Sequence, residues 1–445
     1  MGLNGNQPIT RAQWLTLAAA LLGWMFDGFE QGIFPLVARP ALVDLLNLRE
    51  DAAVAADKGR DDDARAQAKQ RIDARVGAWN GNVGAAFLVG AALGGWFFGW
   101  LGDRLGRVRA MVFSVLTYAL FTGLCGLAQS AWQLAGLRLL SSLGMGGEWA
   151  LGVALVMESW EPEARPLLAG LIGAAANVGF ILTGVLVTLL LNLQLKVDEG
   201  GWRWVLGACA FPALLTFFLR MFVPESEKWH QAVRAGPRAG IAEIFTPQLR
   251  GHTAIGTVLA CVALIGTWGA VQWIPLWVKQ MTDSQQMANN AQMASGLGAV
   301  LGALSGALLG QRLGRRRTYF VLCLGSLLVC AWLFRWHFQV RGGVDGWFFA
   351  LVLLTGACTA SFYGWLPLYL PELFPTRVRA TGQGFSYNFG RILAAGGSLS
   401  MGFLMSDRVF HGDYARAGAT ISLIYVVGLA VIWLAPETRG KPLPE

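Results

Sequence analysis

The sequence predicts an all-α membrane protein with twelve transmembrane helices in two pseudo-symmetric halves of six. Of its 445 residues, 55% are hydrophobic and only 14% are charged. Apolar stretches of about 20 residues, each long enough to cross ~30 Å of hydrocarbon, recur along the chain. One short basic phrase occurs twice, as Gly99-Trp-Leu-Gly-Asp-Arg-Leu-Gly-Arg-Val-Arg109 and as Ala307-Leu-Leu-Gly-Gln-Arg-Leu-Gly-Arg-Arg-Arg317. Such a repeat is expected of two related halves.

The apolar stretches set the order of the elements. We expect an N-terminal half at residues 1–223, a cytoplasmic interdomain linker at 224–252 that mixes Pro, Gly, Arg and Glu, and a C-terminal half at 253–445. The expected spans are 14–36, 81–102, 110–128, 131–157, 166–192 and 203–223 in the first half, and 253–280, 290–311, 318–338, 346–370, 380–405 and 417–434 in the second.

The halves match at two further places. The phrase Glu158-Ser-Trp-Glu-Pro-Glu-Ala-Arg165 parallels Glu372-Leu-Phe-Pro-Thr-Arg-Val-Arg379, with the same spacing from Glu to Arg. Pro224-Glu-Ser-Glu-Lys228 parallels Pro436-Glu-Thr-Arg-Gly-Lys441. Three matches in one register indicate a duplication.

Basic residues in the short loops predict the orientation. The first span is too long for the apolar region of a signal peptide and should stay as an anchor. Lys and Arg favour the cytoplasmic side, so both termini should be cytoplasmic. The net charge of +8 then reflects this bias, and no nucleic-acid partner is expected. The loop arginines are Arg104, Arg107, Arg109, Arg312, Arg315, Arg316, Arg317, Arg377 and Arg379.

Residues 40–78 carry seven basic and eight acidic side chains, and Asp61–Arg75 has a helix-forming composition without proline. We expect an extracytoplasmic helical insertion. A solvated loop without functional consequence is the other interpretation.

The cysteines and histidines do not suggest chemistry. Cys125, Cys209, Cys261, Cys323, Cys330 and Cys358 are scattered through the expected spans without paired spacing, as small buried apolar residues would be. The four histidines stand apart from them, so neither a metal, a cofactor nor an enzymatic activity is expected.

Over essentially its whole length the chain resembles the major facilitator superfamily. The resemblance is carried by the Gly-x-Leu-x-Asp-Arg-x-Gly-Arg phrase at 99–107, the Pro-Glu-Leu-Phe-Pro-Thr-Arg phrase at 371–377 and the Pro-Glu-Thr-Arg-Gly-Lys ending. It implies the major facilitator fold and transport by alternating access.

Several phrases resemble the sialic acid and monocarboxylate proton symporters within this superfamily. They are Arg11-Ala-Gln-Trp14, Gly23-Trp-Met-Phe-Asp-Gly-Phe-Glu30, Gly144-Met-Gly-Gly-Glu148, Glu158-Ser-Trp160 and Gly384-Phe-Ser-Tyr-Asn388. The aromatic-acid proton symporters are similar too, sharing an Asp-Gly-Phe-acid phrase in the first helix and the pair Gly390-Arg391.

Charges inside the spans are candidates for function, because an unpaired charge in hydrocarbon costs several kcal/mol. Asp27 and Glu30 lie three residues apart and so on one face of the first helix. Two carboxylates this close in a partly dry cavity do not both ionise easily, which suits a proton carrier. A simple salt bridge to a neighbouring helix is the alternative.

The fourth helix adds Arg138 and Glu148. An arginine at this position is often linked to proton coupling in the superfamily, and we assign Arg138 to the acid cluster as an ion-pair partner. Glu148 is either a second titrating acid or a structural hydrogen bonder.

Arg391 in the eleventh helix, with Tyr387 and Asn388 one turn before it, is a candidate fork for a substrate carboxylate. Its alternative is an ion pair with an acid of the other half. Cavity-lining candidates are Trp273, Trp277, Tyr363, Trp365, Gln272 and Asn177, although tryptophans at these depths also face lipid.

The loop phrases predict a cytoplasmic gate. Asp103 could meet the N-terminus of the eleventh helix, whose dipole favours an anion. Arg104, Arg107 and Glu158 should form a network, and Arg165, Glu372 and Arg379 occupy matching positions in the repeat. Because Gln311 replaces Asp103 in the second copy, the gate there should be weaker or differently paired.

These features together predict a monomeric, multi-pass inner-membrane protein that takes up a small organic anion with protons. Anion uptake against an inside-negative potential needs a coupled cation, and the first helix offers a proton site. Sialic acid, a short monocarboxylate and an aromatic acid all fit. A proton-coupled sugar porter and a transporter-like sensor remain as alternatives.

Overall fold

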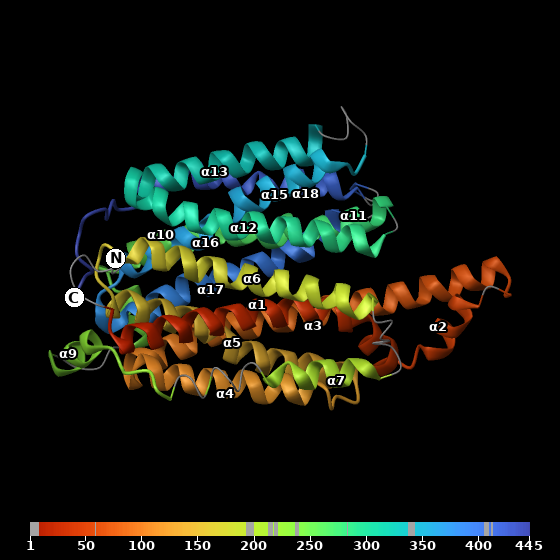
Figure 1. Ribbon diagram of the computed structural model, residues 1–445, viewed down its shortest axis with the longest axis horizontal. Helices are drawn as coiled ribbons and strands as arrows, with labels where there is room; N and C mark the ends of the chain where they lie inside the picture. The colour runs from red at the N-terminus through yellow and green to blue at the C-terminus, as the bar shows by residue number, and fades with distance from the viewer. Residues whose placement is uncertain are drawn as a thin grey trace.

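The computed structural model describes residues 9–57, 59–192, 200–211, 217, 221–235, 240–282, 284–336, 343–404, 409–410 and 413–445. Within these ranges every regular element is helical, and the long helices run side by side along the longest axis (Figure 1). Nine helical segments of the described chain are long and apolar enough to cross a membrane. The all-α membrane class is therefore confirmed, while the number twelve stays a prediction.

The N-terminal half contains a helix over each of its first five expected spans, with bounds that differ, and the expected span 203–223 lies partly outside the described residues. Thr10 caps the first helix by accepting a hydrogen bond from the backbone of Gln13 at 3.2 Å. The helix then runs nine residues past the expected end. The elements are α1 (Arg11–Leu45), α2 (Arg49–Ala56), α3 (Asp62–Leu105), α4 (Arg107–Cys125), α5 (Ala131–Ser159), α6 (Arg165–Asn192) and α7 (Gly201–Ala208).

The linker contains α9 (Glu227–Ala235) and a short 3-10 helix at Ile241–Phe245. The C-terminal half then consists of α10 (Arg250–Gly269), a 3-10 turn at Val271–Trp273, α11 (Ile274–Thr282), α12 (Gln285–Leu313), α13 (Arg315–Ala331), a π-helical turn at Trp332–Trp336, α15 (Gly346–Ala360), α16 (Phe362–Tyr369), a 3-10 turn at Leu370–Leu373, another at Thr376–Val378, α17 (Arg379–Leu404), α18 (Tyr414–Ser422), α19 (Ile424–Val431) and a final 3-10 turn at Ile432–Leu434.

Three expected spans divide into two helices each within the described residues. The span 253–280 divides near Ala270, shortly before Pro275, the span 346–370 divides at Ser361, shortly before Pro367, and the span 417–434 divides at Leu423. Proline has no N–H and its ring crowds the carbonyl four residues earlier, which favours a break before it at the first two sites. Helix α1 nevertheless continues through Pro35 and Pro40.

The repeated basic phrase forms the same tight turn in both halves. Gly106 joins α3 to α4 with φ of 108°, and Gly314 joins α12 to α13 with φ of 90°. Residues other than glycine rarely adopt this conformation, so Gly106 and Gly314, at matching places in the two phrases, have a defined backbone role.

The halves meet along several helix pairs. Helix α3 packs against α17, and α6 packs against α12 and α16. Figure 1 shows α6 and α17 between the other helices of the two halves. A Cβ atom placed on Gly384 of α17 would lie 2.5 Å from the carbonyl oxygen of Gly95 in α3. The two backbones are therefore in direct contact, as small residues permit in membrane helices.

The insertion is helical where the structure describes it. Helix α3 is continuous over 44 residues, and its first turns project with α2 beyond the bundle, at the end opposite the two termini (Figure 1). Arg71 of α3 pairs with Asp51 of α2 at 2.7 Å. Ile72 and Val76 are buried in a cluster with Leu42 of α1. The insertion is thus tied to the bundle by apolar packing.

Candidate functional site

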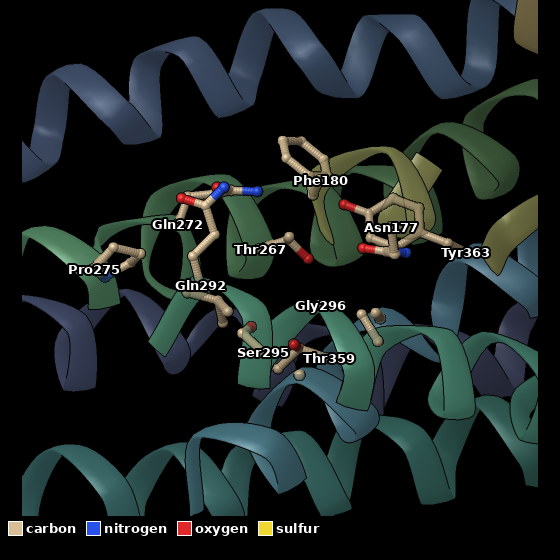
Figure 2. A pocket seen from close by; sticks show the side chains of 14 residues that line it. Asn177, Phe180, Thr267, Gln272, Pro275, Gln292, Ser295, Gly296, Thr359 and Tyr363 are labelled. Atoms are coloured by element: carbon tan, nitrogen blue, oxygen red, sulfur yellow. The ribbon is translucent and has the colours of Figure 1, made fainter. Parts of the chain in front are cut away.

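A polar cavity lies between the two halves. It has a volume of about 50 Å³, is partly continuous with solvent, and is bounded by α6 on one side and by α10, α11, α12, α15 and α16 on the other. None of its lining side chains is charged at neutral pH. The lining residues are Asn177, Phe180, Thr267, Val271, Gln272, Pro275, Gln292, Ser295, Gly296, Ala299, Gly356, Thr359, Ala360 and Tyr363 (Figure 2).

Three of the residues expected at a cavity, Asn177, Gln272 and Tyr363, line this one, whereas the expected tryptophans are not among its lining residues. Trp365 is fully buried within the C-terminal half, where it stacks on Tyr369 with 4.5 Å between ring centroids. Trp277 and Trp273 also pack inside that half, next to Phe334 and Tyr414 respectively. Large apolar rings gain more from core packing than from facing a polar cavity.

Arg391 of α17 is 5% exposed. Its guanidinium carbon lies 5.3 Å from the ring centroid of Tyr387 and 5.9 Å from that of Trp24. The buried Nη1 atom has no hydrogen-bond partner, and no carboxylate of the described residues lies within ion-pair distance. The hydroxyl group of Tyr363, which lines the cavity, likewise has no hydrogen-bond partner among the described residues.

The two residues expected to accompany Arg391 have packing roles in this conformation. The ring of Tyr387 stacks on Trp149 of α5 at 3.9 Å and 13°. Asn388 donates to the carbonyl of Gly384 at 2.9 Å, and a Cβ atom on Gly95 of α3 would collide with its amide. Neither residue is among those that line the cavity.

The acid cluster lies between α1 and α5. Glu30 forms an ion pair with Arg138, and both are 2% exposed. The Arg138 guanidinium also lies over the rings of Phe34 and Phe87, at 4.2 and 4.6 Å from their centroids. Asp27 is fully buried. The structure thus joins Glu30 to Arg138 in an apolar setting where a charge needs a partner.

Glu148 is buried on α5, 4% exposed. Gly28, next to Asp27, brings α1 against the backbone of Ala176 in α6, because a Cβ atom at residue 28 would collide with the carbonyl there. This close approach leaves little room around the acid cluster.

Asp103 joins the halves at the end of the bundle that holds the termini. It accepts hydrogen bonds from the backbone N–H groups of Ala380 at 3.2 Å and Thr381 at 2.7 Å, and from the Thr381 hydroxyl at 2.5 Å. Its carboxylate thereby caps the N-terminus of α17, where the helix dipole favours an anion. Arg107 donates to the same carboxylate at 2.6 Å.

Glu158 is the centre of the same network. It accepts from Arg107 at 2.9 Å, from Arg379 of the other half at 3.0 Å and from Ser226 of the linker at 2.5 Å. Glu158, Arg107 and Arg379 have fully buried side chains. We call Asp103, Arg107, Glu158 and Arg379 the gate cluster.

Arg104 does not belong to this cluster. Its side chain is exposed and lies over the ring of Trp100, with the guanidinium carbon 5.1 Å from the centroid. Adjacent helical residues point about 100° apart, so Arg104 faces away when Asp103 faces α17.

The second copy of the phrase bonds within its own half. Arg315 pairs with Glu372 at 2.5 Å, and Thr438 donates to Glu372 at 2.5 Å. Glu437 accepts from the backbone N–H of Arg315 at 2.9 Å and caps α13. Burial alone would raise the pKa of Glu437, but the N–H groups of Arg315, Arg316 and Arg439 outweigh it and lower the pKa.

The counterpart of the Asp103 cap is missing on both sides. Gln311 stands in its place and is exposed. Pro166 and Leu167 stand where Ala380 and Thr381 are, and they lack the N–H and the hydroxyl respectively. Arg165, the counterpart of Arg379, donates to the carbonyl of Trp160 in its own half at 3.3 Å.

The sequence analysis gave no role to the linker residues that support the gate cluster. Glu225 caps α4 by accepting from the backbone of Arg107 at 2.8 Å, as Glu437 caps α13. Trp229 of α9 donates to the carbonyl of Asp103 at 2.9 Å. The repeated Pro-Glu phrases at 224 and 436 were the sequence feature from which the matching caps of Glu225 and Glu437 could have been predicted.

A family model described as the Major Facilitator Superfamily matches residues 71–398. The chain belongs to this superfamily. The match spans both halves, so the resemblance expected from the sequence is confirmed, and the protein is a transporter and not an enzyme.

Named relatives of this superfamily protein transport organic acids or related compounds. It is 33% identical over 431 residues to a probable 4-methylmuconolactone transporter of Cupriavidus pinatubonensis, covering 96% of this chain and 91% of the relative. It is 29% identical over 351 residues to the cis,cis-muconate transport protein of Acinetobacter baylyi, covering 74% and 82%.

A solved structure supports the fold. The proton:xylose symporter of Escherichia coli, bound to 6-bromo-6-deoxy-D-glucose, superposes with a TM-score of 0.75 at 18% identity and 97% coverage of both chains. At this identity the likeness concerns the fold alone.

Proposed function

We propose that the protein is a secondary active transporter that takes up a small organic acid together with protons by alternating access. The observation that carries the proposal is Arg391, a buried cation without a carboxylate partner among the described residues. A buried guanidinium is stabilised by a bidentate carboxylate, and an anionic substrate would supply one. The relatives named for muconolactone and muconate support the same substrate class.

Proton coupling is assigned to Asp27 and Glu30, with Arg138 as the fixed cation and Glu148 as a further buried acid. Arginine stays charged in any environment, so Arg138 remains the ion-pair partner of Glu30 until a proton or a conformational change competes. We treat this cluster of buried acids as the proton site.

The gate cluster is assigned to the cytoplasmic side, because the arginine-rich loops adjoin it. Its bonds between the halves close that end of the molecule. The polar cavity then belongs to a conformation whose cytoplasmic exit is shut. We place both termini in the cytoplasm, the insertion at 40–78 outside, and the domain boundary in the linker at 224–252.

The test is uptake by the purified protein in proteoliposomes under an imposed pH gradient. Labelled organic acids should accumulate when the outside is acidic and should equilibrate without accumulation when the gradient is collapsed by a protonophore. A sugar porter is the second candidate, because the cavity lining is uncharged. Gradient-driven accumulation of neutral sugars but not of acids would replace the proposal with this candidate.

A further inference from the structure

The polar cavity and Arg391 together restrict the charge of the substrate. Resting on the proposed function, we infer that the site selects an acid with one carboxylate and an uncharged polar body, and discriminates against dicarboxylates. The carboxylate binds toward Arg391 and Tyr363, and the uncharged body binds toward Gln272 and Gln292.

The available positive charge sets the limit of one carboxylate. Arg138 and Arg391 are both buried, and Arg138 is already paired with Glu30. Arg391 is left to compensate a substrate anion. A second carboxylate would have no cation to face, because no side chain that lines the cavity is charged.

The cavity has two ends of different chemistry. Figure 2 shows Asn177 and Tyr363 toward one end and Gln272 and Gln292 toward the other. At the Tyr363 end the buried hydroxyl of Tyr363 has no hydrogen-bond partner among the described residues, as is true of the Nη1 atom of Arg391, so both can donate to a carboxylate. A bound acid therefore has one orientation that brings its carboxylate to the cation.

The lining groups fit an uncharged polar body. Thr267 and Thr359 donate their hydroxyls to carbonyls of their own helices, at 2.9 and 2.8 Å, and keep only acceptor capacity. Within the described chain, Gln272 and Gln292 bond no protein group, so their amides can donate to and accept from a ligand. Lactone, ester, hydroxyl and amide groups match such partners, whereas an ionised carboxylate needs stronger compensation.

Alternating access should increase the discrimination between monocarboxylates and dicarboxylates. The cavity opens to solvent in this conformation, where water can hydrate a second charge. Both ends must be closed at one stage of the cycle, and a second carboxylate then loses that water without gaining a cation. The preference for monocarboxylates over dicarboxylates should therefore be larger in transport than in binding to the open state.

The experiment compares muconolactone with cis,cis-muconate, which are isomers as free acids. Closing the lactone ring turns one of the two carboxylates into a neutral ester and changes little else. We expect muconolactone to bind to the wild-type protein in detergent at least about tenfold more tightly, and to be transported into proteoliposomes with a larger preference. The pair 3-hydroxybenzoate and isophthalate provides the same comparison on an aromatic ring.

Moving a cation into the uncharged end should reverse the preference. Gln292→Arg should raise the affinity for the dicarboxylate of each pair relative to the monocarboxylate by about tenfold or more. Gln286→Arg makes the same change on the exposed face of α12, outside the cavity lining, and should leave the ratio unchanged.

The outcomes separate the two proposals. Equal or tighter wild-type binding of the dicarboxylates overturns the inference but leaves organic-acid transport intact. Equal binding of muconolactone and its methyl ester overturns both, since no carboxylate is then recognised. Failure of all four acids to bind also counts against the inference. The wild-type comparison holds even if Gln292→Arg does not fold.

Discussion

Two arginines of α17 show what distinguishes a structural charge from a candidate ligand-binding charge. Arg379 and Arg391 are both buried. Arg379 bonds Glu158 at 3.0 Å and the carbonyl of Pro444 at 2.7 Å, so its charge is compensated by the protein. Arg391 lacks a comparable acid among the described residues. A buried charge is costly without a partner, and a transported anion would remove that cost once per cycle.

The first prediction concerns the shape of the Arg391 side chain. Arg391→Lys keeps the charge but loses the planar fork, so the affinity for an organic acid should fall by about 1–3 kcal/mol. Arg391→Ala should nearly abolish acid binding. Titration of the purified variants with an acid and its neutral amide measures both effects.

The control for this prediction is discrimination by the wild type. Wild type should reject the amide strongly, because binding it would leave the guanidinium unpaired, and Arg391→Ala should treat acid and amide alike. Strong preference for the acid in Arg391→Ala would show that another group binds the carboxylate.

A second prediction addresses the acid cluster. Asp27→Asn should abolish accumulation driven by a pH gradient while counterflow exchange partly remains, since exchange requires only that the loaded carrier reorients. Glu30→Gln should be measured beside it because the two acids lie three residues apart on one face of α1. Accumulation by Asp27→Asn at the wild-type level would exclude Asp27 as the coupling acid.

At the scale of elements, the gate is a contact between one carboxylate and one helix end. Asp103 caps α17, and the corresponding contact between α12 and α6 lacks the carboxylate, one of the two backbone N–H donors and the hydroxyl donor. The two halves share a fold and a turn geometry, yet one side of the gate is bonded across the halves and the other is bonded within its half. Closure at this end therefore depends on α3 and α17.

The third prediction follows from that asymmetry. Asp103→Asn should destabilise the closed gate by roughly 1 kcal/mol or more, because an amide compensates the helix dipole less well than a carboxylate. Reporter cysteines placed at the two ends of the cavity should become more reactive on the cytoplasmic side and less on the other. Unchanged labelling would remove the cap from the mechanism.

Gln311→Asp is the matched comparison. The new carboxylate would face a position where Pro166 has no N–H to donate, so we expect little change in labelling. A shift as large as that of Asp103→Asn, in the opposite direction, would show that the second copy can form the cap after all.

The fourth prediction tests the contact of α3 with α17. Gly384→Ala places a methyl group 2.5 Å from the Gly95 carbonyl oxygen, and the helices must separate. Overpacking of this kind costs about 1–3 kcal/mol. It should destabilise the conformation with the closed gate, in which the two helices touch, so the same labelling assay should shift toward the open state. Gly136→Ala on α5 meets no atom within 4 Å and serves as the control. Equal behaviour of the two variants would mean that the contact is not limiting.

At the scale of the whole molecule, hydropathy and repetition were sufficient for the class of fold. Long apolar spans must be helical in lipid, because every backbone group needs an internal partner. Hydropathy carries no information on local backbone geometry. We therefore did not expect the breaks near Ala270 and Ser361, or the continuity of α3 from the insertion into the bundle. These features depend on proline positions and tertiary packing.

The candidate site was predictable where charge made it visible. Glu30, Arg138, Asp103 and Glu158 stood out because charges are rare in these spans, and the structure places Glu30 with Arg138 and Asp103 with Glu158's partner Arg107. The cavity residues of α12 and α15 did not stand out. Ser, Thr and Gln also occur in membrane helices for packing, and sequence alone does not say which of them face a cavity.

Helix α3 is one rod of 44 residues, about 66 Å long at 1.5 Å per residue. Its first turns belong to the projecting insertion and its last turn carries the gate aspartate. A stiff element of this kind would transmit a change in the orientation of the insertion to the gate. A ligand that bound the insertion more tightly in one orientation would then bias the gate, and the gate would change the affinity for that ligand by the same factor. With the insertion outside and the gate in the cytoplasm, as we propose, a ligand on one face of the membrane would influence the other face.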